Sequence, residues 1–144
     1  MSAKEFRELL ISLRACEEAR EWAKGKTLSN VWKTCKRGDW MLWLCGKMAD
    51  KPSWPTRQEV VLAACACAEH ALKYVKAGEE RPRIAIETAR KWARGEATIQ
   101  EVRDAANAAY AAANAAYADA RTKSQLTSAD ICRKLLKVPT KGSL

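Results

Sequence analysis

Start and stop signals for helices constrain the fold of this 144-residue chain more than any other feature of its sequence. Thr56–Glu59 and Thr98–Glu101 are capping boxes, in which a threonine and a glutamate bond the backbone N–H groups at a helix start. Gly25, Gly78 and Gly95 follow helical patterns at positions where glycine commonly ends a helix. No segment alternates between polar and apolar residues for long enough to predict a strand. The sequence therefore predicts an all-α fold.

The apolar residues between these signals predict a compact single-domain bundle of about six or seven helices around one buried central helix. The central helix is expected over residues 57–76, because its segment Val60–Ala68 is apolar on all sides. Asp39 is expected to cap another helix, since its carboxylate can accept hydrogen bonds from the first turn. The remaining helices are expected over residues 3–24, 29–35, 39–49, 82–94, 99–121 and 128–137.

The net charge of +9 arises from 26 basic and 17 acidic residues distributed along the whole chain. An evenly basic surface favours encounter with acidic partners and argues against a DNA mimic, which would be strongly acidic. No apolar run reaches the roughly 18 residues of a membrane span. The first residues, MSAKEFRELL, are too charged for a signal peptide. These features predict a cytoplasmic protein without membrane contact.

The C-terminal segment is the most basic part of the chain. From Arg121 onward it holds six basic residues against Asp130 alone. A charge run of this kind is usually a solvated face, although it also suits phosphate contacts. We assign residues 1–121 to a helical domain and residues 122–144 to a basic helix and tail, packed on that domain or flanking it.

The six cysteines are expected to be reduced and mostly buried. Cytosolic thiols stay reduced, and a chain of this size needs no disulfides to fold. Metal binding is the alternative, because Cys65, Cys67 and His70 lie close together in the sequence. On an ideal helix, however, Cys65 points away from Cys67, whereas a structural zinc site needs four converging ligands. We therefore predict neither a metal nor another cofactor.

Residues suited to catalysis are sparse. His70 is the only histidine, and its place on the central helix predicts a buried core residue. Cys35 lies beside Lys36 and Arg37, which can lower the pKa of a thiol, but no base accompanies it. The sequence contains no Gly-rich phosphate loop, no GxSxG motif and no metalloprotease helix motif. It therefore predicts a protein without enzymatic activity.

The segment AANAAYA occurs twice in succession near the C-terminus. Its period of seven places Asn107 near Asn114, and Tyr110 near Tyr117, on almost the same face of a helix. Packing within the molecule, with the polar stripe outward, is one interpretation. A surface for self-association or for a partner is the other. Both a monomer and a homodimer are compatible with this pattern.

The stretch TCKRGDWMLWLCG places two of the six tryptophans directly after a charged turn. On a helix that starts there, Trp40 and Trp43 share one face, while the methionines and the cysteine share another. One face can therefore enter the core while the other stays partly free, with Arg37 and Asp39 at its rim. Tryptophan and arginine are common anchors of protein interfaces. The candidate partner-binding residues of this stretch are Arg37, Asp39, Trp40 and Trp43.

Four motifs occur in a distinctive order over residues 30–118. They read Trp32…Cys35-x-Arg37-Gly38-Asp39-Trp40…Trp43-Leu44, Ala63-Ala-Cys-Ala-Cys-Ala68, Glu80-Arg81-Pro82-Arg83-x-Ala85-Ile86-Glu87 and Trp92-Ala93-Arg94-Gly95. In this order they resemble the immunity-five-like family of bacterial and phage immunity proteins. An arginine often stands in that family where this chain has His70, which gives the histidine no special role.

The resemblance implies an all-helical, non-enzymatic protein that neutralises a protein target by occlusion. The target would be a toxin or a defence effector, and the basic charge favours one with an acidic surface. Arg81 and Arg83 join the candidate partner-binding residues on this ground, with salt bridges around Pro82 as their alternative role. A nucleic-acid-binding accessory protein and a self-associating structural module are the competing interpretations, since six tryptophans in a basic chain also suit base stacking.

Overall fold

The computed structural model describes the backbone of residues 1–113 and 118–140, and the side chains of residues 1–109 and 123–140. Within these residues the chain forms eight α-helices and no strand, which confirms the predicted all-α bundle. The helices are α1 (Ala3–Ser12), α2 (Glu17–Trp22), α3 (Leu28–Thr34), α4 (Gly38–Met48), α5 (Arg57–Ala71), α6 (Arg81–Ala93), α7 (Ile99–Ala113) and α8 (Ala118–Leu135). A 3₁₀ turn, η1 (Leu72–Tyr74), extends α5.

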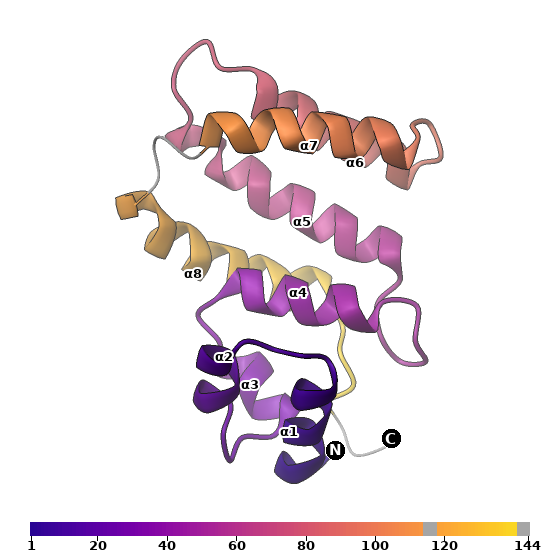
Figure 1. Ribbon diagram of the computed structural model, residues 1–144, viewed down its shortest axis with the longest axis vertical. Helices are drawn as coiled ribbons and strands as arrows, with labels where there is room; N and C mark the ends of the chain where they lie inside the picture. The colour runs from indigo at the N-terminus through magenta and orange to yellow at the C-terminus, as the bar shows by residue number, and fades with distance from the viewer. Residues whose placement is uncertain (114–117, 141–144) are drawn as a thin grey trace.

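The helices stack in layers along the longest axis of the molecule (Figure 1). α1, α2 and α3 form a cluster at one end, next to α4. α4 runs beside α8, and α5 packs against both of them. α6 and α7 pair at the opposite end, where α6 lies on α5. α5 is therefore the central helix predicted over residues 57–76, although it ends at Ala71 and not at residue 76.

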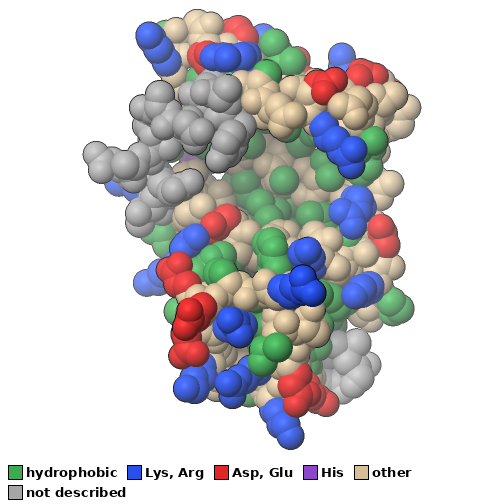
Figure 2. Space-filling model, viewed as in Figure 1, with side chains coloured by type: hydrophobic (Ala, Val, Ile, Leu, Met, Phe, Trp, Pro, Cys, Tyr) green, Lys and Arg blue, Asp and Glu red, His purple; other side chains and the backbone are tan. Residues whose placement is uncertain are grey.

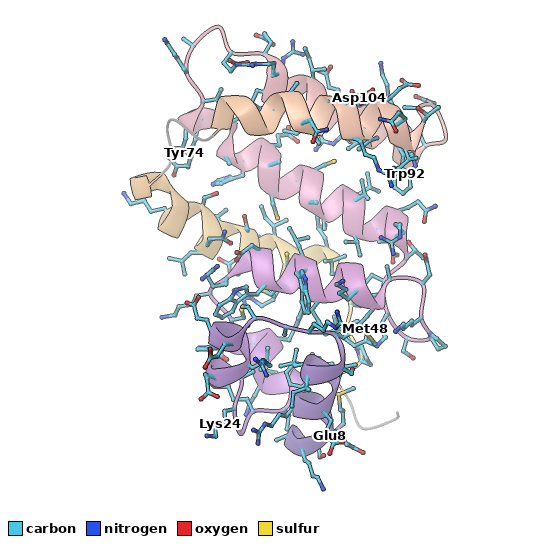
Figure 3. All side chains as sticks on the ribbon, in the orientation of Figure 1. Glu8, Lys24, Met48, Tyr74, Trp92 and Asp104 are labelled. Atoms are coloured by element: carbon cyan, nitrogen blue, oxygen red, sulfur yellow. The ribbon has the colours of Figure 1, made fainter. Side chains whose placement is uncertain are left out.

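Most of the buried apolar side chains in the described residues form two clusters that meet at α4. One cluster joins α4, α5 and α8 through Met41, Cys45, Ala63, Cys67, Ala129 and Cys132, among others. The other joins the three N-terminal helices to α4 through Phe6, Leu10, Leu28, Val31, Leu44 and Met48, among others. In Figure 3, Met48 lies where α4 meets the N-terminal helices. Burying each large apolar side chain contributes about 1.5–3 kcal/mol relative to leaving it exposed.

Three capping boxes begin helices within residues 1–113, and two of them were predicted from the sequence. At the start of α5, Glu59 N–H donates to Thr56 Oγ1 at 3.1 Å and Thr56 N–H donates to Glu59 Oε2 at 2.8 Å. Thr98 and Glu101 bond each other in the same way at the start of α7. The third box, Ser2–Glu5, begins α1. It has the same sequence pattern, so the same rule could have found it.

The helix predicted over residues 3–24 is interrupted, because α1 ends near Leu13. Arg14 adopts a left-handed φ of 59°. Its N–H donates to the carbonyl of Ile11, and the N–H of Ala15 donates to that of Leu10, both at 3.0 Å. These two bonds form a common helix-ending motif, in which the residue after the helix has a left-handed conformation. That residue is usually glycine, and here it is Arg14. The prediction was wrong because arginine occupies the position and gives no stop signal.

α4 begins without the side-chain cap predicted for Asp39. The helix starts at Gly38, and Arg37 at its N-cap position makes no capping bond. Asp39 lies in the first turn, where its carboxylate accepts from Arg37 instead. Its own N–H donates to Oε1 of Gln125 at 2.9 Å. A side chain of α8 therefore supplies an acceptor at this helix start, and the cap prediction was wrong.

The C-terminal helices differ from their predicted bounds. α8 runs over Ala118–Leu135, so it contains most of the helix predicted over residues 128–137 and the end of the one predicted over residues 99–121. It packs on both α4 and α5. α8 starts earlier than the helix predicted from residue 128, because no glycine or proline separates the two predicted helices. The domain boundary after residue 121 stays a prediction.

α5 is central but is not buried on every side. Val60 and Ala63 are buried, whereas Leu62 is 44% exposed. His70, predicted as a core residue, is exposed, and its Nε2 lies 3.4 Å from Nζ of Lys73. The prediction for His70 was wrong because the main neighbours of α5, namely α4, α6 and α8, leave part of its surface open.

Candidate functional site

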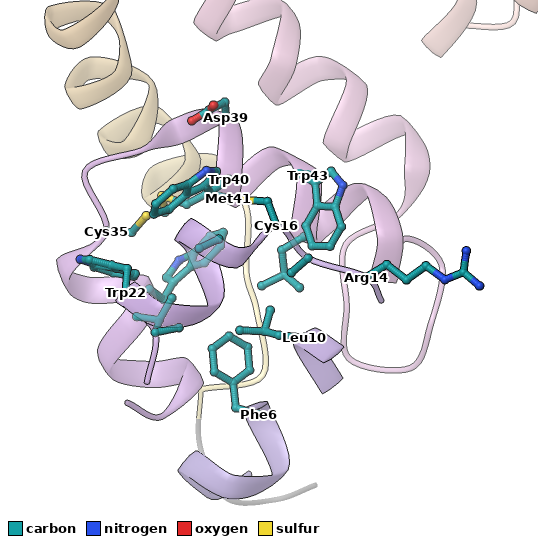
Figure 4. A pocket seen from close by; sticks show the side chains of 16 residues that line it. Phe6, Leu10, Arg14, Cys16, Trp22, Cys35, Asp39, Trp40, Met41 and Trp43 are labelled. Atoms are coloured by element: carbon teal, nitrogen blue, oxygen red, sulfur yellow. The ribbon is translucent and has the colours of Figure 1, made fainter. Parts of the chain in front are cut away.

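A pocket of about 480 Å³ opens between the N-terminal helices and α4 (Figure 4). Its floor consists of buried apolar side chains, among them Phe6, Leu10 and Met41. An apolar cleft of this volume, with few polar groups at its edge, is typical of a binding site. We call it the tryptophan pocket; its rim holds Trp22, Trp40, Trp43, Arg14, Cys16 and Asp39.

Arg37 joins the candidate residues of this stretch into one cluster beside the pocket. Its Nε and Nη2 donate to the two carboxylate oxygens of Asp39, at 2.9 and 2.8 Å, and its Nη1 lies 3.7 Å from Glu18. The hydrogen bond to Asp39 raises the pKa of the guanidinium. The guanidinium carbon lies 4.4 Å from the ring centre of Trp40, which in turn lies 6.0 Å from that of Trp22. Arg37 therefore holds Asp39 and Trp40 in position.

Each of the three rim tryptophans carries a basic side chain near its ring. Nζ of Lys26 lies 4.3 Å from the ring centre of Trp22, and Nζ of Lys47 lies 5.8 Å from that of Trp43. Arg37 covers the third ring. Such cation–π contacts contribute about 0.5–1 kcal/mol each at exposed sites. They orient the rings and place positive charge around the mouth of the pocket.

α8 fixes the chain segment that leads into α4. Nη1 of Arg133 donates to the backbone carbonyls of Trp32 and Cys35, at 3.2 and 2.8 Å, where α3 ends. Gln125 accepts the N–H bond in the first turn of α4. The backbone of Gly38 lies so close to α8 that a Cβ at this position would collide with it. One edge of the pocket is therefore built on a rigid frame.

Arg81 and Arg83 lie at the start of α6, in the layer at the opposite end of the molecule (Figure 1). Arg81 donates to Glu79 from Nε and Nη2, both at 2.6 Å. Arg83 donates to Glu80 at 2.6 Å and to Glu87 at 2.7 Å. Both arginines therefore form the salt bridges that the sequence analysis named as their alternative role. The structure does not bring them to the tryptophan pocket, and their role in partner binding stays a prediction.

The carboxyl group of Glu79 has a pKa of about 2, because the side chain and the backbone N–H of Arg81 both donate to it. We expect Arg81→Gln to raise this pKa towards the usual value of 4.5. Side-chain carboxyl titration by NMR measures the change. Arg83→Gln is the control, since it removes bonds to Glu80 and Glu87 but none to Glu79. An unchanged pKa in Arg81→Gln would contradict the pairing.

The predicted self-association residues are only partly covered by the described residues. Asn107 is exposed on α7. The side chain of Tyr110 and the whole of Asn114 and Tyr117 lie outside the described residues. A self-associating surface on this repeat therefore stays a prediction.

Five of the six cysteines are buried, and Cys16 is exposed at the rim of the pocket. Burial raises the pKa of the Cys35 thiol and raises that of Cys45 to about 12. The hydrogen bond with Cys67, together with burial, raises the pKa of Cys132. Cys35, considered above as a nucleophile, is thus not activated. Among the described residues no group of three His, Cys, Asp or Glu side chains converges as a metal site requires.

The surface carries acidic and basic side chains mixed together on the face shown in Figure 2. The same face is hollowed between α7 and the layer of α4 and α8, and hydrophobic side chains are visible in the hollow. Leu62 on α5 is 44% exposed, so α5 presents at least one large apolar side chain to solvent. None of the helices in the described ranges has the length and apolar composition needed to span a membrane.

The candidate residues of α4 that were predicted from the sequence lie on one side of the pocket only. Phe6, Leu10 and Trp22 also contribute to the same cavity. They do so because the chain turns at Arg14, where a continuous helix was predicted. Neither glycine nor proline marks that turn, so the residues that usually signal a helix end are absent there.

A family model described as Imm-5 like putative immunity protein matches residues 53–129, which is more than half of the chain. The match covers α5, α6, α7 and much of α8, and it leaves the tryptophan pocket outside. No curated protein and no solved structure matches the chain. The motifs on the later helices and the family match agree, and the chain belongs to the Imm-5 like family of putative immunity proteins.

Proposed function

We propose that this protein is a non-enzymatic immunity protein that binds a protein target in the cytoplasm and neutralises it by occlusion. Membership of the immunity family supports a protein partner. The tryptophan pocket carries the proposal, because it is a preformed apolar cleft with tryptophan and arginine at its edge, the residue types that anchor interfaces. The net charge of +9 favours a target with an acidic surface. A bacterial or phage toxin, or a defence effector, fits this description.

Occlusion requires a surface that binds the target tightly. It does not require the protein to catalyse any reaction on that target. A rigid surface is an advantage, because each side chain that must be ordered on binding costs about 0.5–1.5 kcal/mol. Arg37 and Trp40 already hold each other in the free protein, and α8 fixes the segment that carries them. This pre-organisation supports a binding role for the rim of the tryptophan pocket.

Affinity capture from nuclease-treated host lysate tests the proposal. One stoichiometric protein partner is expected, and its activity should be lost when the purified proteins are mixed in equal amounts. Capture of many proteins that disappear on nuclease treatment would instead support a nucleic-acid-binding protein, whose affinity should fall steeply with salt. A mass that rises with concentration in light scattering, without a captured partner, would support the self-associating module.

The captured target is expected to bind Trp40→Ala at least about 30-fold more weakly than the wild type, as for an interface anchor. Isothermal titration calorimetry measures this loss, and circular dichroism checks that the helices remain. Leu62→Ala is the matched control, since it removes an exposed apolar side chain from α5. It should change the affinity by less than about fivefold. Strong binding by Trp40→Ala and weak binding by Leu62→Ala would place the interface on α5.

A further inference from the structure

The tryptophan pocket is shaped for an apolar group that enters from outside. Nine of its sixteen lining residues, all apolar, are buried, and these form the floor. The polar side chains that line it, Arg14, Cys16 and Asp39, are exposed and belong to the rim. A ligand that fills this space must therefore be apolar where it contacts the floor and polar where it contacts the rim. A large apolar side chain of a folded target or of a peptide segment has that form.

The charge around the mouth selects against cations. The ring faces that would attract a cationic ligand already carry the protein's own Lys26, Arg37 and Lys47. A basic or methylated amine group entering the pocket would meet these charges at short range. Like charges brought together at an interface are repelled, which excludes such partners.

The basic side chains around the pocket also differ in whether a carboxylate of the protein pairs with them. Asp39 and Glu18 pair with Arg37. Within the described residues, no carboxylate oxygen lies within 4.0 Å of the charged nitrogens of Arg14, Lys26 or Lys47. The carboxylates of Glu17 and Glu21, also on α2, do not line the pocket. Positive charge around the pocket therefore remains available for acidic groups of a partner.

We infer that the tryptophan pocket receives one large apolar side chain of the target, such as Leu, Met or Phe, flanked by Asp or Glu residues that pair with Arg14, Lys26 and Lys47. This inference rests on the proposed function and specifies the chemistry of its partner. The apolar side chain supplies the affinity by leaving water. The flanking carboxylates supply the orientation and the rate of encounter.

Peptide selection tests this chemistry without knowledge of the target. A phage-displayed library of random 12-residue peptides is selected on the wild-type protein and counter-selected on Ala19→Phe. Ala19 lines the pocket on α2 and is half-buried, so a phenyl ring at this position fills space that a ligand would occupy. Enriched peptides are synthesised and titrated by tryptophan fluorescence, and circular dichroism verifies that each variant is folded.

We expect enriched peptides to share a large apolar residue with Asp or Glu on either side. Their affinity should fall at least about 30-fold on Ala19→Phe, as when an interface anchor is lost. Arg14→Glu should weaken binding about tenfold, through one lost ion pair and one new repulsion. Arg103→Glu is the matched control for charge, because Arg103 is exposed on α7, away from the pocket lining. It should change the affinity by less than about threefold.

Several results would overturn the inference. Peptides that bind Ala19→Phe with the same affinity as the wild type do not use the pocket. Enriched peptides that lack acidic residues do not use the positive charge around it. Equal effects of Arg14→Glu and Arg103→Glu would likewise exclude a local role for Arg14. If no peptide is enriched, the inference is also wrong. Binding of the aromatic sulfonate ANS to the wild type, but not to Ala19→Phe, would then assign the pocket to a small apolar anion.

The captured target separates this inference from the proposed function. A target that is neutralised equally well by Ala19→Phe and by Arg14→Glu would overturn the inference and leave the proposed function intact. Failure to capture any protein target would overturn the proposed function, while the peptide titrations would still report on the pocket.

Discussion

Gly38→Ala is expected to lower the free energy of unfolding by about 3 kcal/mol, because a new methyl group has no space between α4 and α8. A Cβ at this position would lie 2.3 Å from Cβ of Ser128 and 2.8 Å from the backbone nitrogen of Ala129. Backbone atoms cannot turn away as a flexible side chain does, so the two helices must move apart. Urea denaturation followed by circular dichroism measures the change. The midpoint of thermal unfolding should fall by about 10 °C.

Gly46→Ala is the control for this effect, because it makes the same substitution in the same helix. Nothing lies within 4 Å of a Cβ at this position. Alanine in a helix is favoured over glycine by about 0.5–1 kcal/mol, so this variant should be slightly more stable than the wild type. If Gly38→Ala proves as stable as Gly46→Ala, the close approach of α4 and α8 is wrong.

Leu136→Ala is expected to destabilise the protein by about 3 kcal/mol, through lost burial and the cavity left behind. Leu136 is 1% exposed and packs in the cluster that joins α4, α5 and α8. Urea denaturation measures the loss. A loss of this size would also show that residues beyond 121 belong to the folded domain. That outcome would decide the domain boundary predicted from the sequence.

The neighbouring Leu135→Ala is the control, since Leu135 is 52% exposed. Removing this side chain should change the stability by no more than about 0.5 kcal/mol. Equal losses in the two variants would mean that the end of α8 packs in a different register from the one described here.

Local sequence rules predicted a helix boundary correctly where a glycine or a capping residue stands at that boundary. The threonine–glutamate boxes and the glycines gave the starts of α5 and α7 and the end of α6 correctly. They failed at Arg14, which takes a left-handed conformation usually adopted by glycine. They failed again at Asp39, where a cap was expected. The side chain of Gln125, from a distant part of the chain, accepts a backbone N–H bond in the first turn of α4 instead.

The candidate site could be predicted only as far as one helix extends. The periodicity of α4 placed Trp40 and Trp43 on a partly free face, and both line the tryptophan pocket. The opposite wall depends on how α1 and α2 fold against α4, which is a matter of tertiary packing. Arg81 and Arg83 were grouped with the α4 residues because of their motifs, yet each bonds its own neighbouring glutamates. Whether these residues bind a partner stays a prediction.

The contacts between α8 and the segment before α4 have a consequence for how the protein is made. The bonded residues are 86 to 101 positions apart in the chain. A ribosome adds roughly 5–20 residues per second, so about 5–20 s pass between synthesis of the first partner and the second. During that interval the tryptophans of α4 have emerged or are emerging, but their frame does not yet exist. If the proposed function is right, we expect the newborn chain to be able to bind its target only after α8 has been synthesised and has packed on α4.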